Sequence, residues 1–152
     1  MFRLLLGTLV VTAAAFGQVP SEMKYDPQAN PNAGLKAAIE RAGQEHKQRI
    51  LMDVGGEWCG WCHRMDKFLA DHAELLALLN KNYVVLKVNF SPENENKAFL
   101  AKYPKVAGYP HLFVLDGAGI LLVSKDTGEL EEGKSYNLTR FLQFLEKYAP
   151  AK

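Results

Sequence analysis

Hydrophobic residues along the chain follow two spacings, one typical of buried strands and one typical of amphipathic helices. Short apolar runs predict four strands, at residues 50–54, 83–90, 111–115 and 120–123. Apolar residues that recur every three or four positions predict helices at residues 33–48, 59–70 and 138–148, and start signals predict two more, at 71–79 and 91–103. Strands that alternate with helices and end in a hairpin and a helix predict an α/β fold, with a mixed sheet covered on both faces.

Polar residues mark the expected starts of several helices. Asn32 is placed to cap the helix over residues 33–48. The pattern Asp71-x-x-Glu74 has the form of a capping box and predicts a helix start at that point. Ser91, followed by a proline, predicts the start of the next helix. Residues 127–136 are polar and are expected to form a loop.

The first residues differ in kind from the rest. Arg3 precedes an almost wholly apolar run over residues 4–15, and small residues follow before Gln18. This is the pattern of a secretory signal peptide, and the run is too short to span a membrane. We therefore divide the chain into a signal peptide (1–17), an extended lead-in (18–32) and one domain (33–152). The expected location is periplasmic or secreted, with no stable membrane insertion after cleavage.

Composition excludes some classes of function. The chain has 152 residues, of which 48% are hydrophobic and 23% charged, as expected for one globular domain. A net charge of +1 argues against a nucleic-acid partner. Zinc normally takes four ligands, and a single pair of cysteines cannot supply them, so no metal site is expected.

The two cysteines, Cys59 and Cys62, lie where the first strand passes into a helix. A helix N-terminus carries unpaired N–H groups and about half a positive charge, which stabilise a thiolate. A second thiol one turn further can attack the mixed disulfide that the first one forms. An exported protein meets an oxidising compartment, so the pair could be a structural disulfide. However, a bridge across two residues constrains little of the unfolded chain, and redox exchange explains it better.

Four features resemble one known family. Residues 58–62 read W-C-G-W-C, Asp53 lies on the strand before them, Lys87 lies on the next strand, and residues 106–110 read V-A-G-Y-P before a further strand. Together they are similar to the thioredoxin family, over residues 33–148. The resemblance implies a thioredoxin-like α/β fold, with a central mixed β-sheet flanked by helices on both faces.

The sequence also departs from the pattern of that family. Trp61 replaces the usual proline between the cysteines, and Gly55-Gly56 stands where an aromatic and a small residue are common. His63 takes the place of a basic residue after the second cysteine. These departures bear on redox potential and partner choice.

The resemblance implies a thiol–disulfide oxidoreductase that needs no cofactor and no metal. Its expected partners are protein thiols and disulfides and a separate redox protein. The expected catalytic residues are Cys59 as attacking thiol, Cys62 as resolving thiol, Asp53 as a buried proton acceptor and Pro110 as a cis-proline facing the disulfide. The expected substrate-binding residues are Trp58, Gly60, Trp61 and Tyr109.

Two other functions fit part of the pattern. The sequence from Cys59 to His63 matches C-x-x-C-H, the attachment motif of c-type haem, which is compatible with an exported electron carrier. A non-catalytic thioredoxin-fold binding module is the other alternative. The residues leave open whether the chain reduces, oxidises or isomerises disulfides.

Overall fold

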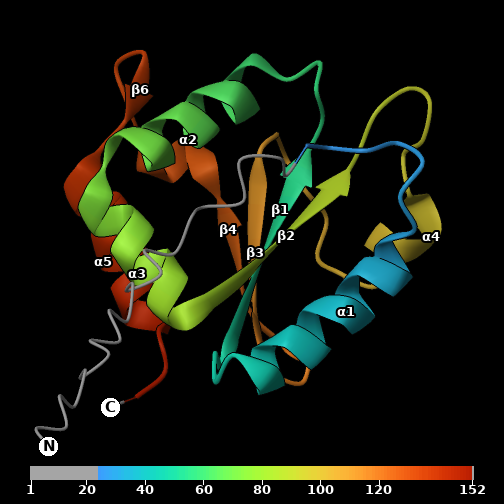
Figure 1. Cartoon of the computed structure of the whole chain (residues 1–152). Coiled ribbons are helices and arrows are strands. Elements are labelled where there is room, and N and C mark those ends of the chain that lie inside the picture. Colours follow the sequence, from blue (N-terminus) through green and yellow to red (C-terminus); the bar gives the residue numbers. More distant parts are fainter. Residues whose placement is uncertain (1–23, 152) are drawn as a thin grey trace, which may run out of the picture.

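A mixed four-stranded sheet forms the centre of the computed structural model, which describes residues 24–151 (Figure 1). The strand order is β2-β1-β3-β4. The strands are β1 (Arg49–Gly55), β2 (Tyr83–Asn89), β3 (His111–Asp116) and β4 (Leu121–Asp126). β1 pairs parallel with β2 and antiparallel with β3, which pairs antiparallel with β4. The predicted signal peptide and residues 18–23 of the lead-in lie outside the described residues.

Helices cover both faces of this sheet, which confirms the predicted thioredoxin-like architecture. On one face lie α2 (Gly60–Asp71), α3 (Ala73–Asn82) and α5 (Leu138–Tyr148). On the other face lie α1 (Pro31–Gln44) and the short α4 (Lys97–Leu100). Each layer contributes apolar side chains to its own buried cluster, so the central strands β1 and β3 are buried on both sides, whereas the edge strand β4 is only partly buried.

Side chains along β1 point alternately to the two faces of the sheet, which determines the ones that face α2. Ile50, Met52 and Val54 pack with α1 and α4, whereas Leu51 packs with α2, α3 and α5. Because successive side chains of a strand point to opposite faces, Asp53 points to the same face as Leu51. The carboxylate predicted to serve the cysteines therefore lies under the helix that carries them.

The first helix begins two residues earlier than predicted. Asn30, not Asn32, is the N-cap of α1, and its side chain accepts hydrogen bonds from the backbone N–H groups of Asn32 and Ala33. Pro31 takes the first helical position, where its fixed φ and missing N–H cost nothing. The helix ends at Gln44, four residues earlier than expected.

Two other predicted helix starts are also wrong. α2 continues through Asp71, whose carboxylate pairs with Lys67 one turn earlier at 2.7 Å instead of forming a capping box. α3 follows with His72 as N-cap and no side-chain cap bond. Ser91 starts no helix, because its hydroxyl accepts a hydrogen bond from the Asn89 side chain and its backbone pairs with Asn94.

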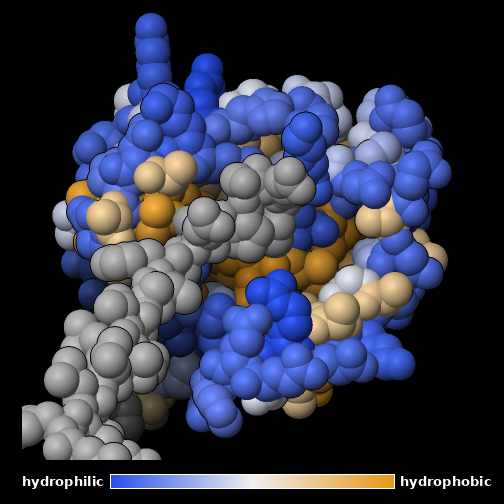
Figure 2. Space-filling model, in the orientation of Figure 1, coloured by the Kyte–Doolittle hydropathy of each residue, from blue (hydrophilic) through white to orange (hydrophobic). Residues whose placement is uncertain are grey.

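The segment predicted as a polar loop contains regular structure. A 3-10 helix, η1 (Thr127–Leu130), is followed by a small hairpin of β5 (Glu131–Glu132) and β6 (Ser135–Tyr136). Leu130 and Tyr136 are buried in the cluster beneath α2 and α5. Hydrophilic side chains predominate on the face seen in Figure 2, and apolar ones are visible between the helices. Within residues 24–151, every helix is too short or too polar to cross a membrane.

Candidate active site

The two cysteines form a disulfide at the start of α2. Cys59 is the N-cap of the helix, and its Sγ accepts a hydrogen bond from the backbone N–H of Cys62 at 3.1 Å. Cys62 lies in the first turn and is fully buried, whereas Cys59 is 4% exposed. Both cysteines are thus buried in the oxidised form.

A tyrosine from the lead-in fills the space beneath the disulfide. Tyr25 is 2% exposed and packs in one buried cluster with Cys59 and Cys62. Its hydroxyl donates to Asp53 Oδ1 at 2.7 Å, and its backbone N–H donates to Glu57 Oε1 at 2.9 Å. Tyr25 therefore connects the carboxylate to the sulfurs. Nothing in the sequence pattern around this tyrosine pointed to the contact, which spans 28 residues.

Asp53 is buried beside a lysine that it shares with a second carboxylate. Asp53 and Lys87 are register partners on β1 and β2. Lys87 Nζ lies 3.4 Å from Asp53 Oδ2 but 2.6 Å from Asp66 Oδ1. Burial raises the pKa of Asp53 from 3.8 to about 6, because desolvation outweighs Lys87 and the Tyr25 hydrogen bond, which both lower it.

Asp66 is a residue that the sequence analysis missed. It lies four residues after Cys62 on α2, so the two side chains share one helix face. Its side chain is 42% exposed, while that of Lys87 is only 7% exposed. Asp66 therefore connects the buried lysine to solvent. The i, i+4 spacing from Cys62 is a signal that could have pointed to it.

An aromatic surface lies beside the disulfide. Trp58 is 55% exposed and meets the Tyr109 ring edge to face, with 6.0 Å between centroids. Its indole N–H donates to the Phe90 carbonyl at 2.7 Å, and Phe90 stacks on Tyr109. Tyr109 also packs against the cluster that contains the cysteines. The Tyr109–Pro110 peptide bond is cis, and the Pro110 carbonyl accepts a hydrogen bond from Thr127.

The other predicted site residues differ in their exposure to solvent. Trp61 is half-buried, with its ring edge to face on Tyr136 at 5.5 Å and the Arg64 guanidinium 4.7 Å from its centroid. Gly60 is exposed, at the first position of α2. The His63 ring is hydrogen-bonded to the Glu57 carbonyl at 2.7 Å. Trp58 is therefore the more accessible of the two tryptophans that flank the cysteines.

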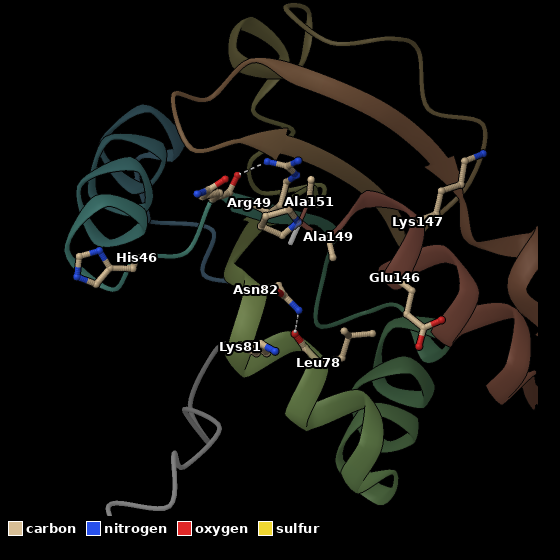
Figure 3. Close-up of a pocket in the computed structure, with 11 residues that line it drawn as sticks. His46, Arg49, Leu78, Lys81, Asn82, Glu146, Lys147, Ala149 and Ala151 are labelled. Atoms are coloured by element: carbon tan, nitrogen blue, oxygen red, sulfur yellow. Dashed lines mark hydrogen bonds between the residues drawn. The ribbon is translucent and has the colours of Figure 1, made fainter.

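A hollow in the described surface lies away from the cysteines. Its volume is about 1050 Å³, and it opens at the opposite end of β1 from the disulfide (Figure 3). Its polar groups are partly satisfied within the protein, since Arg49 donates to the carbonyls of Gln48 and Tyr148, and Asn82 donates to that of Leu78. In residues 24–151, no group of three or more metal-ligating side chains is present.

A buried cysteine pair at a helix start, on a mixed sheet with this topology, defines the class of thioredoxin-like disulfide oxidoreductases. A family model described as thioredoxin-like matches residues 30–117, which is more than half of the chain. The chain belongs to the thioredoxin-like family. This membership accounts for the strand, aspartate and proline around the cysteines, which the haem alternative left unexplained.

Related proteins carry names from disulfide chemistry. A disulfide bond reductase, DsbH of Chlamydia pneumoniae, is 29% identical over 90 residues, which make up 54% of each chain. The match thus spans about half the length of that relative. A disulphide isomerase from Xylella fastidiosa Temecula1 is 25% identical with a TM-score of 0.69, covering 84% of this chain and 97% of that one. The reduced C-terminal domain of Neisseria meningitidis DsbD shares the fold, with 21% identity, a TM-score of 0.52 and coverage of 76% and 95%.

Proposed function

We propose that this chain exchanges disulfides with protein substrates outside the cytoplasm, through Cys59 and Cys62. The observation that carries the proposal is the disulfide at the N-terminus of α2, with a buried carboxylate on the strand beneath that helix. Similarity to a protein named a disulfide bond reductase supports the reaction class. The signal-peptide pattern of residues 1–17 supports export. N-terminal sequencing of the exported protein is expected to begin at Gln18.

The exchange runs in two displacement steps. The Cys59 thiolate attacks one sulfur of a substrate disulfide, which forms a mixed disulfide and releases one substrate thiolate. Cys62 then gives its proton to Asp53, and its thiolate attacks Cys59 Sγ. The Cys59–Cys62 bond forms as the second substrate thiolate leaves. The substrate gains two electrons and the protein loses two, so a separate dithiol protein must restore the reduced pair.

Each neighbouring group has a defined part in this scheme. The N-terminal N–H groups of α2 stabilise the Cys59 thiolate. Asp53, whose pKa of about 6 lies below neutrality, is ionised at neutral pH and can accept the proton of Cys62. Trp58 and Tyr109 offer an aromatic surface for an extended substrate segment. Gly60 is exposed next to Cys59 and carries no side chain, and Pro110 follows Tyr109 through a cis peptide bond.

Reduction and isomerisation begin with the same step. In both, a thiolate of the reduced protein attacks a disulfide of the substrate, whereas oxidation starts from the protein disulfide. The relatives are named for the first two reactions. We therefore propose the reduced pair as the form that meets substrates, with an unidentified dithiol protein as electron donor.

The direct test is to trap the intermediate. In the Cys62→Ala variant the second displacement cannot occur, so reduced protein added to a periplasmic extract is expected to accumulate mixed disulfides on Cys59. These are resolved on non-reducing gels and identified by mass spectrometry after reduction. Cys59→Ala is the matched control and should retain no such species.

The trapping experiment also separates the alternatives. If Cys62→Ala forms no mixed disulfide under any redox condition, the proposed function is wrong. A haem carrier would instead show a Soret band after native expression. A binding module would keep its in vivo function in Cys59→Ala.

A further inference from the structure

We propose that Tyr25 is a positioning residue for the exchange reaction: its ring closes off the buried sulfur of Cys62, and its hydroxyl holds Asp53 as the proton acceptor. This inference rests on the proposed function. It concerns a residue of the lead-in, outside the segment that carries the cysteines and outside the residues 30–117 matched by the family model.

The first support is the shape of the space around Gly55. A Cβ atom added at Gly55 would lie 2.5 Å from Cys62 Sγ and 3.0 Å from both Cζ and Oη of Tyr25. The end of β1 therefore leaves room for one aromatic side chain, and Tyr25 occupies it from a different part of the chain.

The second support is that Tyr25 and Lys87 contact different oxygens of the Asp53 carboxylate. The Tyr25 O–H donates to Oδ1 of Asp53, whereas Lys87 lies 3.4 Å from Oδ2. Each carboxylate oxygen thus faces one donor, and the hydrogen bond from Tyr25 fixes the orientation in which Asp53 accepts a proton. Burial, followed by the nearby Asp53 carboxylate, raises the pKa of the Tyr25 phenol, so the hydroxyl remains a donor throughout the working pH range.

The third support is that Tyr25 is fixed at both ends. Its backbone N–H donates to Glu57, in the loop just before Cys59, while its ring faces Lys87, with Nζ 4.1 Å from the ring centroid. A side chain that is only space-filling would not need a partner on the active-site loop and a second partner at the buried carboxylate. These contacts hold the ring between β1 and α2.

Several titratable groups face Asp53 and must be kept constant in a test. They are Tyr25 from the lead-in, Lys87 from β2, Asp66 from α2 and Tyr136 from β6. The Tyr25→Phe variant removes only the hydroxyl and leaves the others in place. Loss of a hydrogen bond to the charged form raises the pKa of Asp53.

The experiment follows the resolving step directly. Reduced protein is mixed with dithiobis(nitrobenzoate), so that the first thionitrobenzoate reports attack by Cys59 and the second reports displacement by Cys62. The rate of the second release is measured as a function of pH. In Tyr25→Phe, the acidic limb of this profile is expected to move upward by about one pH unit, as for loss of one hydrogen bond to a charged group.

A matched control distinguishes this from a loss of stability. Tyr83→Phe also removes a buried tyrosine hydroxyl, one that donates to the Leu145 carbonyl at 2.6 Å and lies at the far end of β2. Its pH profile should coincide with that of the wild type. Tyr25→Ala tests the ring, and alkylation of Cys62 in the reduced variant is expected to become at least about tenfold faster as water reaches the sulfur.

Each result decides the inference. A Tyr25→Phe profile that coincides with that of the wild type shows that the hydroxyl does not position Asp53. Unchanged Cys62 alkylation in Tyr25→Ala shows that the ring does not close off the sulfur. A titration of the Asp53 carboxyl carbon by NMR in oxidised Tyr25→Phe gives the same answer without turnover. If the wild type itself releases no second thionitrobenzoate, the proposed function has failed, not the role of Tyr25.

Discussion

Replacing Asp53 with asparagine is expected to stabilise the folded protein at neutral pH. Burial raises the pKa of Asp53 from 3.8 to about 6. At 1.36 kcal/mol per pH unit, this rise corresponds to about 3 kcal/mol of folding free energy. Asparagine has nearly the same shape and keeps an oxygen for the Tyr25 hydroxyl, but it carries no charge to desolvate.

The sign of the effect follows from where protons bind. Between pH 3.8 and about 6 the unfolded chain loses the Asp53 proton while the folded chain keeps it. The wild type therefore loses stability as pH rises through this window, and the loss is complete above it. The asparagine variant lacks this dependence. The difference between the two free energies of unfolding should grow from near zero at acidic pH to about 3 kcal/mol in favour of Asp53→Asn at neutral pH.

Urea denaturation of the oxidised proteins at a series of pH values measures this difference. Asp71→Asn is the control, since Asp71 is exposed and only pairs with Lys67 on the helix surface. Its effect should stay below about 1 kcal/mol. The reasoning is refuted if the advantage of Asp53→Asn is the same at every pH, or if this variant is less stable than the wild type at neutral pH.

Two further substitutions test the surroundings of the site. Asp66→Asn removes a negative charge that raises the pKa of Asp53, so an NMR titration should place that pKa lower than in the wild type. An unchanged or higher pKa would contradict the electrostatic coupling between Asp53 and Asp66. Gly55→Ala places a methyl group 2.5 Å from Cys62 Sγ, and thermal unfolding should show a loss of about 1–3 kcal/mol. On helix α1, a Cβ added at Gly43 would have no atom within 4 Å, so Gly43→Ala should instead stabilise the protein by about 0.5–1 kcal/mol. Equal effects of the two substitutions would refute the close packing around Gly55.

Local pattern predicted much of the fold. Continuous apolar runs predict β1 and β3 because both strands are buried on both faces, and β1 and β2 match the predicted segments to within a residue or two. The position of the cysteine pair follows from the same strand and the helix after it, whereas Asp53 is singled out by the family resemblance. These features depend on neighbours in the sequence, which is why a single sequence reveals them.

The errors and omissions arise where distant segments meet. Ser91 looked like a helix start, but a hydrogen bond from Asn89 occupies its hydroxyl. Tyr25 looked like part of an extended lead-in, yet it is buried under the disulfide because Gly55 leaves space for it. Asp66 lies on an exposed helix surface and becomes part of the site only through Lys87, which comes from another strand. Such contacts depend on tertiary packing, and among these residues only Asp66 has a local signal, its i, i+4 spacing from Cys62.

The central claim is that the two sulfurs of the reduced protein are unequal, with Cys59 the reactive one. Alkylation of the fully reduced chain with iodoacetamide at neutral pH, followed by peptide mass spectrometry, measures this directly. The account predicts that Cys59 is modified at least about tenfold faster than Cys62 and faster than a cysteine in the unfolded chain. Equal and slow modification of both sulfurs would contradict it.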